Sequence, residues 1–428
     1  MVLWLLMSCF IVMLAVGTPI GVSLALSAAV VFYALMDIPL IIVVQRMFTS
    51  VDSFSFMAVP FFMLAGAFMS EGGVTKRLVD FAMSLVGALA GGLALVVAVA
   101  GMFFAALSGS SAATTAAIGA SMIGEMERRG YPRTFAAAVV ASAGTVGIVI
   151  PPSITLVVYG SIASVSIADL FTGGFAPGIL MGISMCLVSW YISKKKGYKG
   201  EGSFSLKRVA RSFFECFWAL LMPFIILGGI YSGIFTPTES AAVAAVYGAF
   251  VGLFIYKELT FRDIPKVLLS AAVSTTMIMF VVGGANIFGW ILTNAQVPQS
   301  LAMMFTELTD SPLVFLMLVN VLLLVLGTLV NASAAVVIVT PILLPVVHTL
   351  GIDPLFFGVL MVVNLAIGCI TPPVGLDLFV VSSITKLSID AVTKKILPYL
   401  TVLLLDLLIL TYFPQIITFL PNLVHGAL

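Results

Sequence analysis

The chain has 428 residues, of which 61% are hydrophobic and only 9% are charged, with a mean hydropathy of +1.24. Soluble proteins carry about 25% charged residues, so the composition excludes a soluble domain and predicts an integral membrane protein in contact with the lipid bilayer. A net charge of +1 excludes a nucleic-acid-binding role based on a basic surface.

Apolar runs long enough to enter a bilayer recur from one end of the chain to the other. A crossing needs roughly 20 apolar residues, and the first run lacks the basic start and cleavage site of a signal peptide, so we expect it to be retained. The predicted spans are 2–16, 19–36, 55–72, 131–168, 174–193, 214–232, 238–257, 266–290, 354–386 and 396–421.

Two of these spans, 131–168 and 354–386, are too long for one straight crossing and contain a Pro-Pro pair in the middle. Consecutive prolines remove backbone donors and push the preceding residue out of the helical region. Both spans are therefore predicted to be broken helices, interrupted near Gly147–Ser153 and Gly368–Gly375.

Two further apolar stretches are interrupted by small polar residues, at 107–112 and 327–333. Backbone that leaves a helix at membrane depth is tolerated only where protein buries it or where it lines a polar cavity. We predict two re-entrant helical hairpins that enter and leave the membrane on the same side.

An internal repeat relates these features. A shift of 221 residues aligns 130–177 with 351–398 without a gap and places Ser110 opposite Asn331 at the two hairpin tips. The identities fall on structure-breaking residues, including both Pro-Pro pairs. The repeat therefore pairs the two hairpins and the two broken helices.

Charge indicates that the two halves have opposite orientation, since loops rich in Lys and Arg face the cytoplasm. Basic residues follow the first hairpin but not the second, and they follow the second broken helix but not the first. The loop 194–212 is also basic and predicted to be cytoplasmic, which places both termini on the periplasmic side. The residues concerned are Arg128, Arg129, Arg133, Lys386, Lys394 and Lys395.

The predicted fold class is an all-α polytopic membrane protein with inverted-topology repeats, two re-entrant hairpins and two broken helices. Its predicted parts are N-terminal scaffold helices (1–90), a first transport half (91–193), a cytoplasmic connecting loop (194–212), second scaffold helices (213–311), a second transport half (312–395) and a C-terminal helix (396–428).

Broken helices within a membrane offer free carbonyls and hydroxyls to a hard cation such as Na⁺, and free N–H groups to an anion. If the breaks only kinked packed helices they would bind nothing, but four breaks in symmetric pairs favour a transport site. The predicted Na⁺ sites, two or more, use Ser108, Gly109, Ser110, Gly144 and Gly147 in the first half and Thr328, Asn331, Ser333, Gly368 and Thr371 in the second. The predicted substrate-binding residues are Ser111, Pro152, Ser153, Ala332, Pro373, Val374, Gly375 and Asp377.

Other chemistries fit the sequence less well. The chain has no phosphate-binding GxxxxGK[ST] loop, so it is not an ATP-driven pump by itself. A serine nucleophile needs a nearby histidine, and only His348 and His425 exist, so we expect no enzyme. Glu239 follows Thr236 and Pro237 at the spacing of a capping box, which favours a structural role.

Five strings are similar to the large membrane subunit of tripartite ATP-independent periplasmic (TRAP) transporters. Their order and spacing run from end to end of the chain, but Asp377 stands where that family more usually has asparagine. The strings lie at 60–66, 108–112, 150–153, 228–242 and 371–375.

The resemblance implies a Na⁺-coupled importer of the bacterial inner membrane, in which a transport domain moves against a scaffold like an elevator. It also implies two partners, a small four-helix membrane subunit and a periplasmic substrate-binding protein, and a carboxylate-bearing substrate such as a C4-dicarboxylate or a sialic acid. An autonomous carrier or an anion channel, needing no binding protein, is the alternative.

Overall fold

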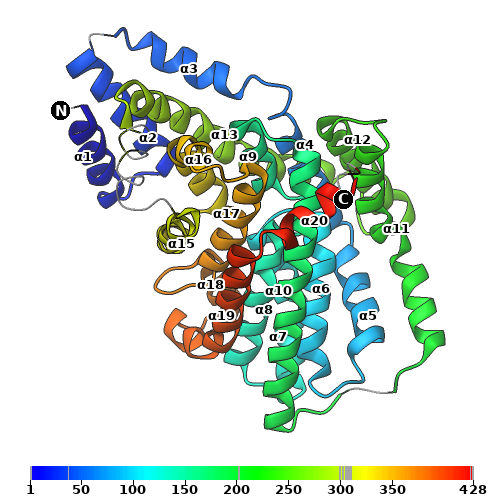
Figure 1. Ribbon diagram of the computed structural model, residues 1–428. Coiled ribbons are helices and arrows are strands. Elements are labelled where there is room, and N and C mark those ends of the chain that lie inside the picture. The colour runs from blue at the N-terminus through cyan, green and yellow to red at the C-terminus, as the bar shows by residue number, and fades with distance from the viewer. Residues whose placement is uncertain are drawn as a thin grey trace.

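The computed structural model describes residues 2–36, 38–200, 203–297, 300, 303, 311–424 and 426, so His425 lies outside the described residues. Every regular element in these ranges is a helix. Figure 1 shows a body of near-parallel helices, with α1, α2 and α3 at one upper edge and α11 and α12 at the opposite side.

The N-terminal helices are only partly those predicted. Helix α3 was missed because it is short and carries Gln45 and Arg46, and α5 was missed because it carries three charged residues. Between α4 and α5 the chain bends by 69°, at Gly73, whose φ of +76° suits glycine. The bounds are α1 Val2–Ala15, α2 Ile20–Val31 with a π-helical turn Phe32–Met36, α3 Ile41–Val51, α4 Ala58–Glu71 and α5 Val74–Val86.

The helix bounds follow the 221-residue repeat closely. Shifted by 221, Ser111–Arg128 becomes 332–349, the bounds of its counterpart α16. The first half contains α6 Gly92–Ser108, α7 Ser111–Arg128, α8 Arg133–Gly144 with a 3₁₀ turn Thr145–Ile148, α9 Ile154–Ala163 and α10 Ile167–Lys196. The second half contains α15 Pro312–Leu329, α16 Ala332–Thr349, α17 Pro354–Gly368, α18 Leu376–Thr385, α19 Ile389–Tyr412 and α20 Gln415–Val424.

Both predicted broken helices are confirmed. The break in the first lies between α8 and α9, and the break in the second lies between α17 and α18. The Pro151–Pro152 and Pro372–Pro373 peptide bonds lie within these breaks, and both are cis. The last span was predicted as one helix over 396–421, but Phe413 and Pro414 separate α19 from α20 there, because proline has no N–H to continue the helix.

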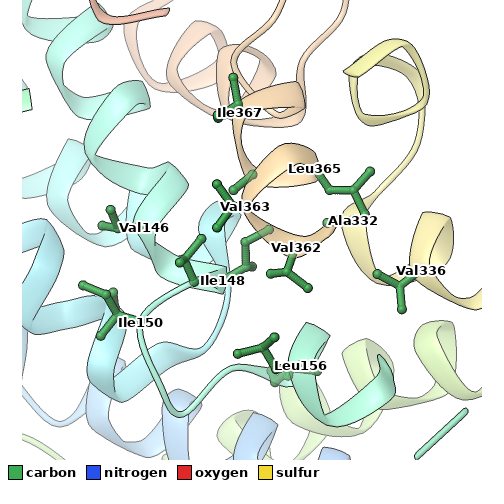
Figure 2. Packing of buried hydrophobic residues seen from close by; sticks show 14 of the residues in the cluster. Val146, Ile148, Ile150, Leu156, Ala332, Val336, Val362, Val363, Leu365 and Ile367 are labelled. Atoms are coloured by element: carbon green, nitrogen blue, oxygen red, sulfur yellow. The ribbon is translucent and has the colours of Figure 1, made fainter. Parts of the chain in front are cut away.

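The two halves interlock, because helices of each half pack against helices of the other. Helix α16 of the second half packs on α9 of the first, and α7 of the first packs on α18 of the second. In the same way α10 packs on α17 while α19 packs on α8. Figure 2 shows the apolar centre of this arrangement, where Ile148 and Leu156 beside the first break lie near Val362 and Val363 of α17.

The remaining helices are α11 Leu206–Tyr231, α12 Pro237–Phe250 with a π-helical turn Val251–Ile255, and α13 Ile264–Asn294. The predicted capping box starts α12: Glu239 accepts hydrogen bonds from the Thr236 N–H and hydroxyl, each at 2.8 Å. The structural reading of Glu239 is therefore confirmed. By length and composition, seven described helices could cross a membrane, or eight if the bent pair α4–α5 is one span.

Two lysine clusters distant in sequence meet in space. Lys195 and Lys196 at the end of α10, and Lys394 and Lys395 at the start of α19, line one cavity of about 850 Å³. The charge pattern assigned both clusters to the same membrane face, and the fold brings them to the same end of the molecule.

Candidate functional site

A cavity of about 310 Å³ lies where the two hairpin tips meet. Both tips contribute residues, as do the flanks of both breaks, and α13 and α4 close the remaining side. Among the described residues that line it, none carries a charge. They include Gly109, Ser110 and Ser111 of the first tip, Asn331, Ala332 and Ser333 of the second, Ile148, Ile154, Thr155 and Leu376 beside the breaks, and Met63, Ser274, Met277, Ile278 and Val281 of α4 and α13.

The first tip packs tightly against the first break. A Cβ atom on Gly147 would lie 2.6 Å from the Ser110 carbonyl oxygen, and one on Gly144 would overlap the Thr115 hydroxyl oxygen. Gly109 takes a φ of +61° and its carbonyl accepts a hydrogen bond from the Ile154 N–H at 3.4 Å. The first predicted set of residues is therefore brought together, with Ser108 bonded to Thr114 at 2.8 Å.

The second tip contacts the second break in a corresponding way. A Cβ atom on Gly368 would lie 2.6 Å from the Gly327 Cα, and the Gly375 N–H donates to the Thr328 carbonyl at 3.0 Å. The Thr371 carbonyl oxygen lies 3.2 Å from the Cβ position of Gly375. Thr328, Gly368 and Thr371 are thus gathered around one backbone contact.

Asn331 and Ser333 lie on another side of the second tip. Asn331 is exposed and accepts a hydrogen bond from the Ser333 N–H at 2.9 Å. The Ser333 hydroxyl lies 3.2 Å from the Thr155 hydroxyl of the first half. These two predicted residues therefore face the shared cavity, while Thr328, Gly368 and Thr371 pack behind the tip.

Three helices begin at the tips and breaks with a side-chain cap. Ser110 accepts from the Ala113 N–H at 3.4 Å, Ser153 from the Leu156 N–H at 3.2 Å, and Asn331 caps α16 as described above. Capping occupies one free N–H at each helix start, and the partial positive charge of each helix end remains.

The predicted substrate-binding residues divide into two groups. Ser111 and Ala332 line the cavity. The others do not: Pro152, Ser153, Gly375 and Asp377 are buried behind it, Val374 is half-buried and Pro373 is exposed.

Asp377 lies in the first turn of α18, which packs against α7. Its side chain is fully buried, and the hydroxyls of Ser111 and Thr115 lie beside the carboxyl group, although neither carboxyl oxygen has a hydrogen bond of ordinary geometry among the described residues. The Ser111 hydroxyl lies 3.8 Å from the Cys369 sulfur, and the Asp377 N–H donates to the Cys369 carbonyl at 3.0 Å. Asp377 therefore stands behind the cavity, beside its wall.

Sequence reasoning missed the side of the cavity formed by α13 and α4, as well as Thr155. Ser274 precedes Thr275 and Thr276 within an apolar run, and these three consecutive polar residues were the sequence signal that could have indicated a polar cavity beside α13. Met63 and Met277 carry no signal that separates them from ordinary core or lipid-facing residues.

Two hairpins and two broken helices in interlocked halves, around a cavity whose described lining residues carry no charge, are typical of a membrane transport protein. The family comparison makes this specific, since a model described as "Tripartite ATP-independent periplasmic transporter, DctM component" matches residues 7–416. The chain belongs to this family and is a multi-pass membrane protein. The resemblance seen in the five sequence strings is confirmed.

Named relatives agree. The chain is 47% identical over 377 residues to a C4-dicarboxylate TRAP transporter large permease protein of Pseudomonas aeruginosa, covering 88% of each. It is 38% identical to a sialic acid TRAP transporter large permease protein of Vibrio cholerae, covering 97% of each. It is also 47% identical to an isethionate TRAP transporter permease protein of Oleidesulfovibrio alaskensis, covering 95% of this chain and 64% of that protein's length.

A solved structure shares the fold. The crystal structure of the Alcanivorax borkumensis YdaH transporter superposes with a TM-score of 0.62 over 86% of this chain and 88% of that one, at 16% sequence identity.

Proposed function

We propose that this chain is the membrane-embedded part of a Na⁺-coupled importer of a small organic anion with a carboxylate group, of the C4-dicarboxylate or sialic acid class. The single observation that carries the proposal is the cavity of about 310 Å³ between the two hairpin tips. Its volume falls at the small end of the roughly 300–1,000 Å³ range of ligand pockets, which suits a small acid.

Helix ends supply the electrostatics of substrate binding. The lining residues that the structure describes include no Lys, Arg or His, whereas α7 and α16 both begin at the cavity. The carboxylate binds the free N–H groups at these helix starts together with the hydroxyls of Ser110, Ser111 and Ser333. The names of the relatives support an anion, since C4-dicarboxylates, sialic acid and isethionate are all acids.

Na⁺ binds where each tip contacts its break, and its charge holds the substrate carboxylate in place. Carbonyl and hydroxyl oxygens are the ligands that a hard cation prefers. The first contact offers the Ser110 carbonyl and the Thr114 hydroxyl beside Gly147, and the second offers the Thr328 and Thr371 carbonyls beside Gly375. Two sites predict that uptake rises with Na⁺ with a Hill coefficient above one.

Transport proceeds by an elevator motion in the bacterial inner membrane. The two interlocked halves, 91–193 and 312–395, move as one body because each packs on the other's helices, and α13 forms part of the stationary wall. A small four-helix membrane subunit extends this scaffold, and a periplasmic binding protein delivers the substrate.

Both termini lie in the periplasm and the lysine-rich end lies in the cytoplasm. Single cysteines at Lys196 and Asn422, in a background without native cysteines, test this orientation with an impermeant thiol reagent. We expect labelling of Lys196→Cys only from the cytoplasm and of Asn422→Cys only from the periplasm. Labelling of both from one side contradicts the inverted arrangement.

Reconstitution tests the function itself. The purified chain alone in liposomes with an inward Na⁺ gradient should give no uptake, and adding the small subunit and the loaded binding protein should give Na⁺-dependent uptake. Saturable uptake by the chain alone indicates an autonomous carrier, and Na⁺-independent, non-saturating flux indicates a channel.

A further inference from the structure

A second cavity, of about 450 Å³, adjoins the first along α13. The two cavities share Val337 of α16, and the adjacent residues Val281 and Val282 of α13 line one each. From Val282 to Thr293 the second cavity follows α13 for roughly 16 Å, at about 1.5 Å per residue. It opens between α3 and α13 on one side and α9 and α16 on the other.

Arg46 of α3 provides the one charged side chain among the described residues that line this second cavity, hereafter the Arg46 cavity. Its guanidinium carbon lies 4.4 Å from the centre of the Trp290 ring. The part of the chain that the structure describes shows no ion pair for Arg46. Its charge is therefore available to a ligand, and the polar residues Ser50, Ser53 and Asn286 line the same cavity.

The position of Arg46 is fixed by packing. Helix α3 crosses α13 at Gly283, where a Cβ atom would lie 3.3 Å from the Met47 carbonyl oxygen. Trp290, on whose ring the Arg46 guanidinium stacks, makes an edge-to-face contact with Phe32, with the ring centres 5.4 Å apart. An arginine stacked on an aromatic ring loses little further entropy when it binds an anion, because its planar head is already oriented.

We propose that the Arg46 cavity is a second anion subsite, which receives the carboxylate of the substrate before or after it occupies the hairpin tips. This inference rests on the proposed function. The substrate cavity holds anions only through helix ends and hydroxyls, so a full positive charge beside it concentrates anions at its entrance. Arg46 forms a charge-assisted hydrogen-bond pair with the carboxylate, and Ser50, Ser53 and Asn286 supply further polar contacts.

Thiol modification tests the electrostatics without requiring transport. In a background without native cysteines, Ser53→Cys is labelled with an anionic sulfonate-bearing and a cationic trimethylammonium-bearing methanethiosulfonate reagent. We expect the anionic-to-cationic rate ratio to fall roughly 3- to 10-fold on Arg46→Gln, the size of one charge acting at short range in a partly solvated cleft. Arg46→Lys should keep the ratio, and 1 M salt should lower it in the parent.

A matched control removes a positive charge outside the cavity. Arg133 lies at the start of α8, 3.9 Å from Glu127, and Arg133→Gln should leave the ratio unchanged. Succinate should slow labelling of Ser53→Cys when Arg46 is present and not in Arg46→Gln, whereas neutral succinamide should slow neither.

The outcomes separate this inference from the proposed function. Equal ratios in the parent and Arg46→Gln overturn the subsite, even if reconstituted uptake proves Na⁺-dependent. A ratio that depends on Arg46, together with succinate protection, supports the subsite even if uptake fails to require Na⁺ or a binding protein. A ratio that depends on Arg46 without succinate protection overturns substrate binding there and leaves only a positive local potential.

Discussion

The two tip-and-break contacts share a fold but differ in how they are closed. Around the first break every residue from Thr145 to Gly160 is buried, whereas Pro373 of the second break and Asn331 of the second tip are exposed. The first contact is thus sealed inside the protein, while the second is open on one side. Related sequence patterns have therefore produced one fully buried contact and one that is partly exposed.

The reason lies in the neighbours of each half. The first break packs against α17, α10 and α6, and Gly174 of α10 approaches it so closely that a Cβ atom would lie 2.6 Å from the Val149 carbonyl. Residues 371–374 lie between α17 and α18, and three of the four are only half-buried. The second contact is therefore less tightly enclosed by neighbouring helices than the first.

The largest expected effect comes from filling the glycine contacts. Gly147→Val and Gly368→Val each place atoms where a Cβ alone meets backbone at 2.6 Å, so the tips must move away from the breaks. We expect Na⁺-driven uptake to fall by roughly two orders of magnitude in both, as is typical when site geometry shifts by about 1 Å. Initial rates in proteoliposomes measure this.

A control for these variants is Gly124→Val, since a Cβ at Gly124 meets no atom within 4 Å. Its uptake should match the parent, and size-exclusion profiles should match for all three. Normal uptake by Gly147→Val would show that the first contact is not needed for transport.

A smaller loss of uptake is expected from substitutions at the two hairpin tips. Ser110→Leu and Asn331→Leu remove a helix cap and a polar group from the cavity, and both should reduce uptake at least roughly 10-fold while expression is kept. Because Asn331 is exposed and Ser110 is half-buried, Ser110→Leu should also lower the unfolding temperature more. Equal transport by both variants and the parent would mean that the tips are simple turns.

A smaller effect tests whether the halves bind Na⁺ separately. Thr114→Val removes the hydroxyl that faces Gly147, and it should raise the Na⁺ concentration for half-maximal uptake roughly 3- to 10-fold, as loss of one charge-assisted contact predicts. The Hill coefficient should then fall toward one. Val336→Thr is the control: it makes the reverse exchange of a methyl and a hydroxyl group, at a buried position in the second hairpin. Its Na⁺ dependence should match that of the parent. An unchanged Na⁺ curve in Thr114→Val places the ion elsewhere.

Much of this site could be predicted from the sequence because its signals are local. Pro-Pro pairs and Ser-Gly tips act through the backbone of their own residues, so both breaks and both tips were found in place. The side of the cavity built by α13 and α4 could not be predicted, since ordinary residues such as Met277 gain a role only through long-range packing. The exchange that places Ser333 beside Thr155 is equally invisible in a linear pattern.

The surroundings of Asp377 also depend on long-range packing that the sequence does not show, and substitution of Asp377 has the smallest expected effect. The repeat places it opposite Leu156, so the second half has a carboxyl group where the first has an apolar side chain. Its intramembrane position predicted a role in substrate binding, but the structure buries it behind the cavity, where neither oxygen has a hydrogen bond of ordinary geometry among the described residues. Leaving a buried polar group unpaired costs about 1–3 kcal/mol, and more for a charged group.

Asp377→Asn keeps the shape of the side chain and replaces one carboxyl oxygen with an amide nitrogen. We expect the variant to be more stable than the parent by up to about 1 kcal/mol in Na⁺-free buffer, because the amide N–H can donate to the hydroxyl groups beside it, and to retain uptake within roughly twofold. Asp406→Asn is the matched control, because one oxygen of Asp406 already accepts a hydrogen bond from Ser184 at 2.9 Å and the gain should be smaller. Unfolding followed by intrinsic fluorescence, with and without Na⁺, measures the difference. If Asp377→Asn instead loses Na⁺-dependent stabilisation that the parent shows, the carboxylate is an ion ligand, and the sealed first half shares its cation site with the second.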